Sequence, residues 1–248
     1  MSGNREQMLG ALWGAAVADA LGVPHEFTDR QVFEVQPVTT MNGYGTHEQP
    51  PGTWSDDTSM TLATLETFFQ QPPVAGEEEA FLKHLIVHFL QWQQEAKYTV
   101  DQQVFDIGNA TAEALRQYVI SEFFWNQPLA LKGLTHEQSQ GNGSLMRMLP
   151  VALWQKAWGS DPELVAQVSA VTHAHPQVIA ACQHYVQCFT YLDSDFSVAL
   201  QRATEDCAEP QLPFYGRILA GTFADTPPRR FLGVVMCCIP LRRRIGVC

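Results

Sequence analysis

The sequence predicts an all-α protein, folded as a single compact multi-helix domain whose loops gather around a central acidic site. Apolar residues recur with helical spacing through most of the chain. No segment before residue 230 alternates between apolar and polar side chains as a half-buried strand would. The 248 residues are 46% hydrophobic and only 17% charged, which is typical of a packed core.

Charge and cysteine content limit the functional classes. The net charge is -11, and because an acidic protein repels phosphate backbones, general nucleic-acid binding is not expected. The sequence has neither a charged-then-apolar N-terminal leader nor an apolar run of membrane length, so we expect no membrane association. Six cysteines follow no zinc-site spacing, which favours reduced thiols and a cytoplasmic protein.

The first predicted helix, residues 8–21, is apolar nearly all round and is followed by Gly22 and Pro24, which end it. It is too short to span a membrane. Asp19 is the exception on this helix. If the helix is buried, this carboxylate needs partners, and otherwise the helix end is exposed.

The second helix begins at an acidic pair. Pro50, Pro51 and Gly52 break the preceding segment, and Ser55, Asp56 and Asp57 fall at the helix start, ahead of the apolar positions Met60, Leu62, Ala63, Leu65, Phe68 and Phe69. Helix capping explains one polar residue there but not two adjacent carboxylates. Two buried charges must share a proton or meet a cation, and a hard divalent ion such as magnesium or manganese fits oxygen ligands. A doubly acidic helix cap remains the alternative.

Two further segments carry acids. Residues 25–49 have no strong period and are predicted to be a long loop containing Glu26. A helix predicted near residues 105–115, with Asp101 as a cap, would place Asp106, Asn109 and Glu113 on one face. An ordinary polar stripe is the alternative.

The helix predicted for residues 77–95 places its apolar residues inward. It also carries His84 and His88 one turn apart. Such spacing suits a metal, although a pair at the edge of the core is commoner.

A glycine-rich segment, residues 140–144, leads toward another helix. Free N–H groups at such a loop can bind an anion such as phosphate, and Arg147, one turn further on, could add a charged fork. The segment matches neither the Walker pattern nor the dinucleotide fingerprint, so its signal is weak. Later helices are predicted from Asp161 to about Thr172, over residues 177–192 and over residues 197–207. His173 and His175 then lie at a corner between helices.

Together these segments resemble the ADP-ribosylglycohydrolase family, which includes the dinitrogenase reductase-activating glycohydrolases. The resemblance is carried, in the family's order and spacing, by residues 14–27, 53–58, 105–111, 141–150 and 172–176. It implies an all-α fold and a two-magnesium centre, with manganese in some members. It also implies cleavage of the glycosidic bond between ADP-ribose and a protein side chain or small acceptor.

The resemblance implies roles for particular residues. Ser55, Asp56 and Asp57 would be metal ligands, with Ser55 where the family usually has Thr. Glu26 would lie in a mobile loop beside the site and Asp106 near the scissile bond, as the catalytic candidates. A cradle for the diphosphate and ribose would be formed by Gly141, Asn142, Gly143, Ser144, Met146 and Arg147, and His173 would contact the nucleotide.

The C-terminal part departs from the family pattern. The family completes its metal site with a late Gly-Asp-Thr-Asp-Thr-like motif, which this sequence lacks, so the second metal site is expected to be incomplete. We expect the family-like domain to cover residues 1–228 and the basic, Cys-rich residues 229–248 to be an aberrant tail. A frameshift would explain this tail, since reading one base earlier permits a helix resembling the one before the late motif. Impaired hydrolysis, an ADP-ribose-binding module without catalysis and another magnesium-dependent phosphohydrolase are the readings left open.

Overall fold

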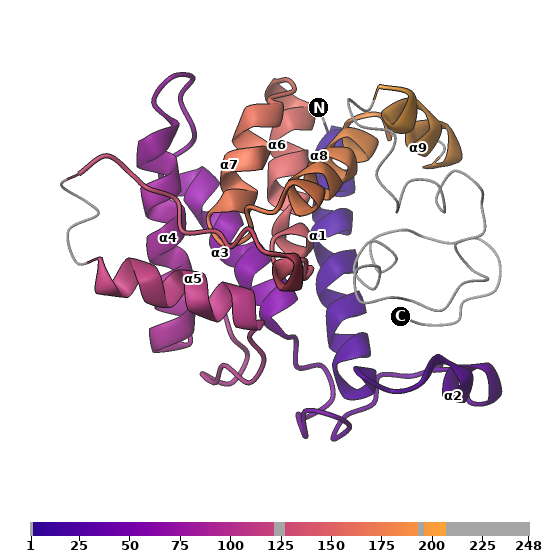
Figure 1. Cartoon of the computed structure of the whole chain (residues 1–248). Coiled ribbons are helices and arrows are strands. Elements are labelled where there is room, and N and C mark those ends of the chain that lie inside the picture. The colour runs from indigo at the N-terminus through magenta and orange to yellow at the C-terminus, as the bar shows by residue number, and fades with distance from the viewer. Residues whose placement is uncertain (1, 122–126, 193–195, 207–248) are drawn as a thin grey trace.

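The computed structural model describes residues 2–121, 127–192 and 196–206, and the all-α prediction is confirmed (Figure 1). These ranges contain no strand, and one isolated bridge joins Leu134 and His173. The helices are α1 (Ser2–Gly22), α2 (Arg30–Val35), α3 (Asp56–Gln70), α4 (Glu78–Glu95), α5 (Asn109–Ile120), α6 (Leu149–Trp158), α7 (Pro162–Ala170), α8 (Pro176–Thr190) and α9 (Phe196–Glu205). Short 3-10 turns form at η1 (Val23–His25), η3 (Glu137–Ser139) and η4 (Leu145–Arg147).

The core lies around α3, which packs against α1, α4, η4 and α6. On the far side of α6, α8 contacts α6, α7 and α9 (Figure 1). The predicted inward face of α4 is confirmed, because Phe81, Leu85, Ile86 and Phe89 are all fully buried. His88 is buried, with its Nδ1 2.8 Å from Thr67 Oγ1, so this member of the histidine pair packs within the bundle.

Local sequence signals fix where several helices begin. The Ser55 hydroxyl caps α3 by accepting the Asp57 N–H, and Asp161 caps α7 by accepting the Leu164 N–H. At α8, His175 is the N-cap and Pro176 the first helical residue. The predicted corner containing His173 and His175 is therefore confirmed, and α3 starts at the acidic pair as predicted.

Three local predictions were wrong. The helix expected from residue 105 begins only at Asn109, since Gly108 is extended and acts as its N-cap, so Asp106 lies in the preceding loop. Phe69 was predicted to face inward on α3 but is 80% exposed, whereas Phe68 beside it packs against Phe81 of α4 at 4.8 Å between ring centroids. A short helix, α2, interrupts the predicted long loop and is capped by Asp29.

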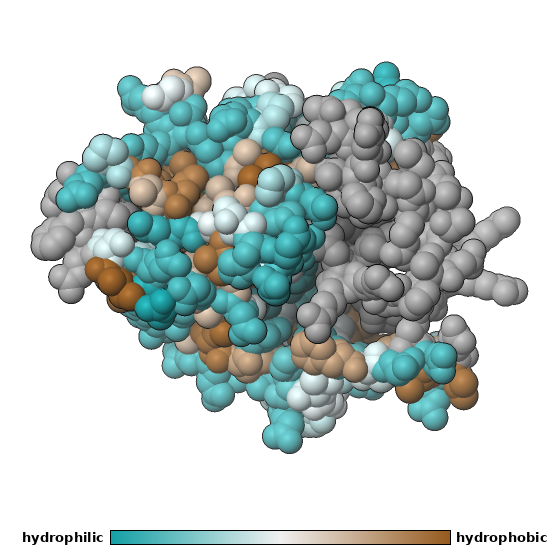
Figure 2. Space-filling view, in the orientation of Figure 1, coloured by the Kyte–Doolittle hydropathy of each residue, from teal (hydrophilic) through white to brown (hydrophobic). Residues whose placement is uncertain are grey.

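Hydrophilic residues cover much of the described surface seen in Figure 2, with hydrophobic residues in separate small groups between them. Among the described residues, no helix is both long and apolar enough to cross a membrane. The predicted tail, residues 229–248, lies outside the described part of the chain, as does the end of the predicted domain from residue 207 to 228.

Candidate metal centre and active site

The N-terminus of α3 is fixed by a carboxylate from another helix. Asp19, near the end of α1, accepts the hydroxyl protons of Ser55 (2.7 Å) and Thr58 (2.6 Å). It also accepts their backbone N–H groups, at 3.1 Å from Ser55 and 3.0 Å from Thr58. All of these partners donate, so Asp19 acts as a cap supplied from outside the helix. The sequence-based expectation that a buried acid there needs partners is confirmed.

Asp19 therefore orients the Ser55 hydroxyl at the start of the acidic pair. The Ser55 hydroxyl donates to Asp19 and accepts the Asp57 N–H, so one lone pair of its oxygen remains for a ligand. Asp56 is 7% exposed, and Asp57 is partly buried one residue further along the first turn of α3. The three residues predicted as metal ligands thus lie together on one helix start.

The acidic pair carries strongly perturbed carboxyl groups. Burial raises the pKa of Asp56 well above its usual range, and the charge of Asp57 raises it further. Burial likewise raises the pKa of Asp57, with added repulsion from Asp19 and Glu26. Within the described residues, no ion pair joins either carboxylate to a basic side chain. Carboxylate and hydroxyl oxygens with unbalanced negative charge fit a hard divalent cation.

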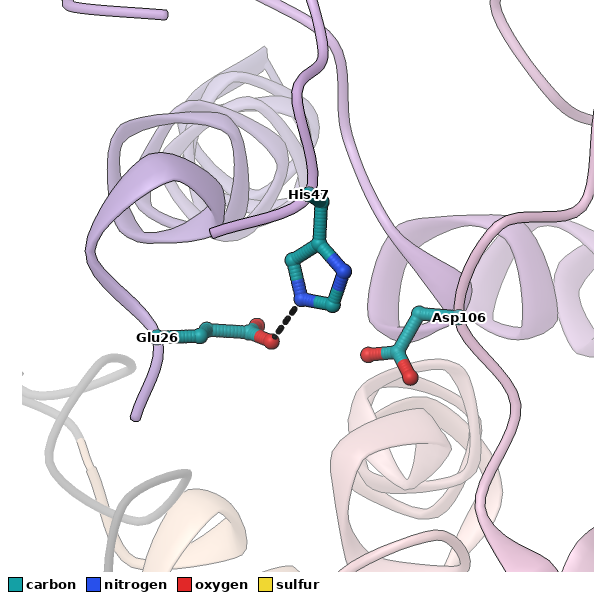
Figure 3. A group of neighbouring side chains, drawn as sticks. All are labelled: Glu26, His47 and Asp106. Carbon is teal, nitrogen blue, oxygen red and sulfur yellow. Dashed lines mark hydrogen bonds and ion pairs between the residues drawn. The ribbon is translucent and has the colours of Figure 1, made fainter. Parts of the chain in front are cut away.

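A second group of ligands lies beside this pair. Glu26 follows η1, His47 lies in the loop between α2 and α3, and Asp106 precedes α5. Figure 3 shows the three side chains pointing toward a common space. One ligand atom from each lies within 4.8 Å of the others, and His47 Nε2 is 2.6 Å from Glu26 Oε2. The arrangement can hold a metal ion or a shared proton.

The two groups form one electrostatic unit. Burial raises the pKa of Glu26, and the negative charges of Asp106 and Asp19 raise it further against the opposing effect of His47. The charges of Asp106 and Glu26 in turn raise the pKa values of both Asp56 and Asp57. Five carboxylates therefore repel one another in one partly buried region, a situation that bound cations would relieve.

The predicted glycine cradle lies next to α3, since Thr61 donates to the Met146 carbonyl at 3.2 Å. Gly141 is exposed and Asn142 is half-buried. Gly143 passes so close to its neighbours that a Cβ there would lie 2.8 Å from both Thr111 Oγ1 and His173 Cε1. Only a glycine fits this passage.

The other cradle side chains point away from solvent. Ser144 is fully buried and bonds Ser169 Oγ at 2.9 Å, and Met146 is 7% exposed within the core. Any contact of these two residues with phosphate or ribose must therefore use their backbone. Only Gly141 and Asn142 of the predicted cradle lie open to a ligand.

The prediction that Arg147 forks onto phosphate does not agree with its position. Its guanidinium is fully buried, packs over the Phe89 ring at 4.7 Å and donates to the carbonyls of Gly143 and Val168 and to Thr172 Oγ1. Burial lowers its pKa to about 10. The sequence signal failed because η4 turns this residue inward, so that Arg147 ties the glycine loop to α7.

His173 also packs against the buried side of the glycine loop. The ring is 2% exposed, its Nδ1 lies 2.8 Å from Thr172 Oγ1, and its edge faces Gly141 and Gly143. Burial and the nearby Arg147 charge lower its pKa to about 3, so the ring is neutral at physiological pH. Because the ring is buried, its position does not agree with the predicted direct contact between His173 and a nucleotide.

Two residues of the site were missed from sequence. His47 lies in an aperiodic loop, and its distance along the chain from residues 26 and 106 gave no signal that the fold would join them. Asp19 was recognised from sequence only as an unusual acid in an apolar helix. Its contacts with Ser55 and Thr58 arise only when helices α1 and α3 pack together. A buried acid in an apolar helix is the signal that could have included it.

Replacing Asp19 tests its role at α3. Asp19→Ala removes a carboxylate cap, so we expect a loss of about 2 kcal/mol in the free energy of unfolding and weaker Mn²⁺ binding. The matched control is Asp161→Ala at α7, which should cost about 1 kcal/mol and leave Mn²⁺ affinity unchanged. Urea unfolding and calorimetry measure the two effects. Unchanged Mn²⁺ affinity in Asp19→Ala would contradict this role.

The raised carboxyl pKa values predict a pH dependence for metal-free protein. Above about pH 4 the unfolded chain has released protons that folded Asp56 and Asp57 still hold, so the free energy of unfolding falls as pH rises toward their folded pKa values. His173 and His184 act in the opposite sense below about pH 6.5, because burial lowers their pKa values. In EDTA, the free energy of unfolding of Asp57→Asn should therefore fall less steeply with rising pH than that of the wild type. The two slopes should differ by at most on the order of 1 kcal/mol per pH unit. Parallel curves for the two proteins would contradict the prediction.

A structural Arg147 makes a different prediction from a phosphate-binding one. Arg147→Met leaves buried acceptors without their donor, so the free energy of unfolding should fall by about 3 kcal/mol. The control is Arg116→Met, at an exposed side chain of α5 that pairs with Glu113 at 2.7 Å. This substitution should change the free energy of unfolding by less than about 1 kcal/mol. Normal stability together with lost ADP-ribose affinity would restore the phosphate role.

The chain is similar to three known glycohydrolases. The chain is 29% identical to the ADP-ribosylarginine hydrolase Tri1 of Serratia proteamaculans, over 77% of this chain and 48% of that protein. It is 32% identical to Tri1 of Pseudomonas putida, over 70% and 43%. Identity to the ADP-ribosyl-[dinitrogen reductase] glycohydrolase of Rhodospirillum rubrum is 30%, over 71% and 54%. The chain thus spans about half the length of these relatives.

A solved structure described as an ADP-ribosylglycohydrolase-related protein complex has the same fold. It matches with a TM-score of 0.68 and 27% identity, covering 92% of this chain and 70% of that one. The model of the family described as ADP-ribosylglycohydrolase matches residues 1–227. On this evidence the chain belongs to the ADP-ribosylglycohydrolase family.

Proposed function

We propose that this chain carries the acidic site of a metal-dependent hydrolase that cleaves the glycosidic bond between ADP-ribose and an acceptor. The observation that carries the proposal is the meeting of Ser55, Asp56 and Asp57 with Glu26 and Asp106 in one partly buried acidic region. We take the ions to be Mg²⁺ or Mn²⁺, since all donors of the acidic pair are hard oxygens. The names of the relatives support ADP-ribosylated arginine, or an ADP-ribosylated protein, as the substrate class.

The residues divide the chemical work as follows. Ser55, Asp56 and Asp57 would hold the cation, which would supply orientation of the ribose hydroxyls and activation of a water. Breaking the bond at the ribose C1 develops positive, oxocarbenium-like charge. Asp106 and Glu26 face this region, so their free carboxylate oxygens would stabilise that charge and accept the proton of the attacking water.

Substrate positioning would use the glycine loop. Gly141 and Asn142 are the parts of that loop open to a ligand, and their backbone could approach the diphosphate closely. Arg147 and His173 would act through the loop, by fixing its conformation from inside. We place the reaction in the cytoplasm, where the free thiols of Cys182 and Cys188 would stay reduced.

The proposal is tested with ADP-ribosyl-arginine, supplied with Mg²⁺ or Mn²⁺ to the 248-residue chain. We expect release of free ADP-ribose, and a loss of rate of roughly 100-fold in Asp57→Asn because a cation ligand is removed. Asp161→Asn, which alters a helix cap away from the site, is the control and should keep the wild-type rate.

Each alternative has its own outcome in this assay. Calorimetric binding of ADP-ribose without any release would identify a binding module instead of a hydrolase. Release of inorganic phosphate in place of ADP-ribose would identify a phosphohydrolase. Either result would overturn the proposed activity.

A further inference from the structure

Phe27 is the most exposed large hydrophobic residue in the described part of the chain, at 87%. It directly follows Glu26, one of the two carboxylates that the proposed function places at the scissile bond. A single exposed phenylalanine on a protein surface is ordinary and needs no explanation. Phe27 differs from that case, because its ring belongs to a group of aromatic side chains at the edge of the acidic region.

Three rings form a row here. The Phe27 ring lies 6.0 Å from the His47 imidazole in an edge-to-face arrangement, and the Phe105 ring lies 5.3 Å from the same imidazole, measured between centroids. His47 and Phe105 are half-buried, whereas Phe27 is open to solvent. The row therefore leads from the half-buried part of the site outward, with the Phe27 ring at its outer end.

The two proposed catalytic carboxylates lie along this row. Glu26 Oε2 is 2.6 Å from His47 Nε2, and the Asp106 carboxylate points toward the same space (Figure 3). The Glu26 side chain is 30% exposed, so a group arriving from solvent can reach it. Because a carboxylate has two acceptor oxygens, Glu26 can accept a further donor at Oε1.

An open aromatic ring beside carboxylates suits a planar cation. A guanidinium group is attracted to an aromatic face within about 6 Å of its centroid, and its N–H groups also donate to carboxylate oxygens. A hydroxyl acceptor such as serine carries no charge and gains neither interaction. The acceptor is bonded to the ribose C1, which the proposed function places beside Glu26 and Asp106, so the acceptor lies within reach of the Phe27 ring.

From these observations we infer that Phe27 is a specificity-determining residue, whose ring forms a wall of the acceptor site and favours a guanidinium acceptor over an uncharged one. The guanidinium stacks on the Phe27 ring and donates to the second oxygen of Glu26. The inference rests on the proposed function, which places the glycosidic bond beside Glu26 and Asp106. The competing explanation is that Phe27 only shields the pair of His47 and Glu26 from water, in which case it serves every substrate alike.

Replacing the ring separates these explanations. Phe27→Leu keeps an apolar side chain without the aromatic face, so kcat/KM for ADP-ribosyl-arginine should fall roughly 3- to 10-fold, whereas Phe27→Tyr keeps the face and the wild-type value. With ADP-ribosyl-serine, and in calorimetric binding of ADP-ribose, Phe27→Leu should match the wild type. Phe69→Leu, at an 80% exposed ring on the opposite end of α3 from the acidic pair, is the control and should change nothing. Equal losses with both substrates, weaker ADP-ribose binding or an unchanged kcat/KM for ADP-ribosyl-arginine in Phe27→Leu would overturn the inference.

Binding of intact ADP-ribosyl-arginine tests the inference even if the wild type releases no ADP-ribose. In that case the proposed activity fails, and calorimetry compares the affinities for ADP-ribosyl-arginine and for ADP-ribose. Tighter binding of ADP-ribosyl-arginine that is lost in Phe27→Leu and kept in Phe27→Tyr supports acceptor recognition by the ring. Equal affinities for the two ligands in the wild type, or the same preference in Phe27→Leu, overturns it.

Discussion

Burial and mutual repulsion of five partly or fully buried carboxylates form the constraint on which this structure depends. Burial raises the pKa values of Asp19, Glu26, Asp56 and Asp57, and the negative charges of their acidic neighbours, Asp106 included, raise the last three further. Burying such a group costs stability unless protons or cations balance it. The fold compensates in part at Asp19, whose four donors come from Ser55 and Thr58. The remaining imbalance is concentrated at Asp56 and Asp57, where a cation would be held most strongly.

The helices around this region form a packed core behind the acidic side chains. Packing of α3 against α4 buries Met60 and Phe89, and Arg147 fastens the glycine loop to the C-terminal end of α7. The acidic residues themselves lie at helix ends and in loops, which can approach a substrate closely. This division explains how a largely apolar bundle carries a concentrated charge without losing its core.

Much of this arrangement could be predicted from sequence, because its signals are local. The helical periods, the capping of α3 and α7 and the placement of Ser55, Asp56 and Asp57 follow from neighbouring residues. The positions of Asp106 and Arg147 could not be predicted, since Gly108 delays one helix and the η4 turn rotates the other side chain inward. His47 joins Glu26 only through tertiary contacts such as that of Thr46 with Pro24. Sequence therefore predicted the position of the acidic pair better than the positions of the residues around it.

The central claim is that divalent cations occupy this acidic region, and locating them tests it most directly. Crystals grown with Mn²⁺ and measured for anomalous scattering should show a peak about 2.2 Å from oxygens of Asp56 and Asp57. Well-ordered Asp56 and Asp57 side chains without any anomalous peak at saturating Mn²⁺ would contradict the account.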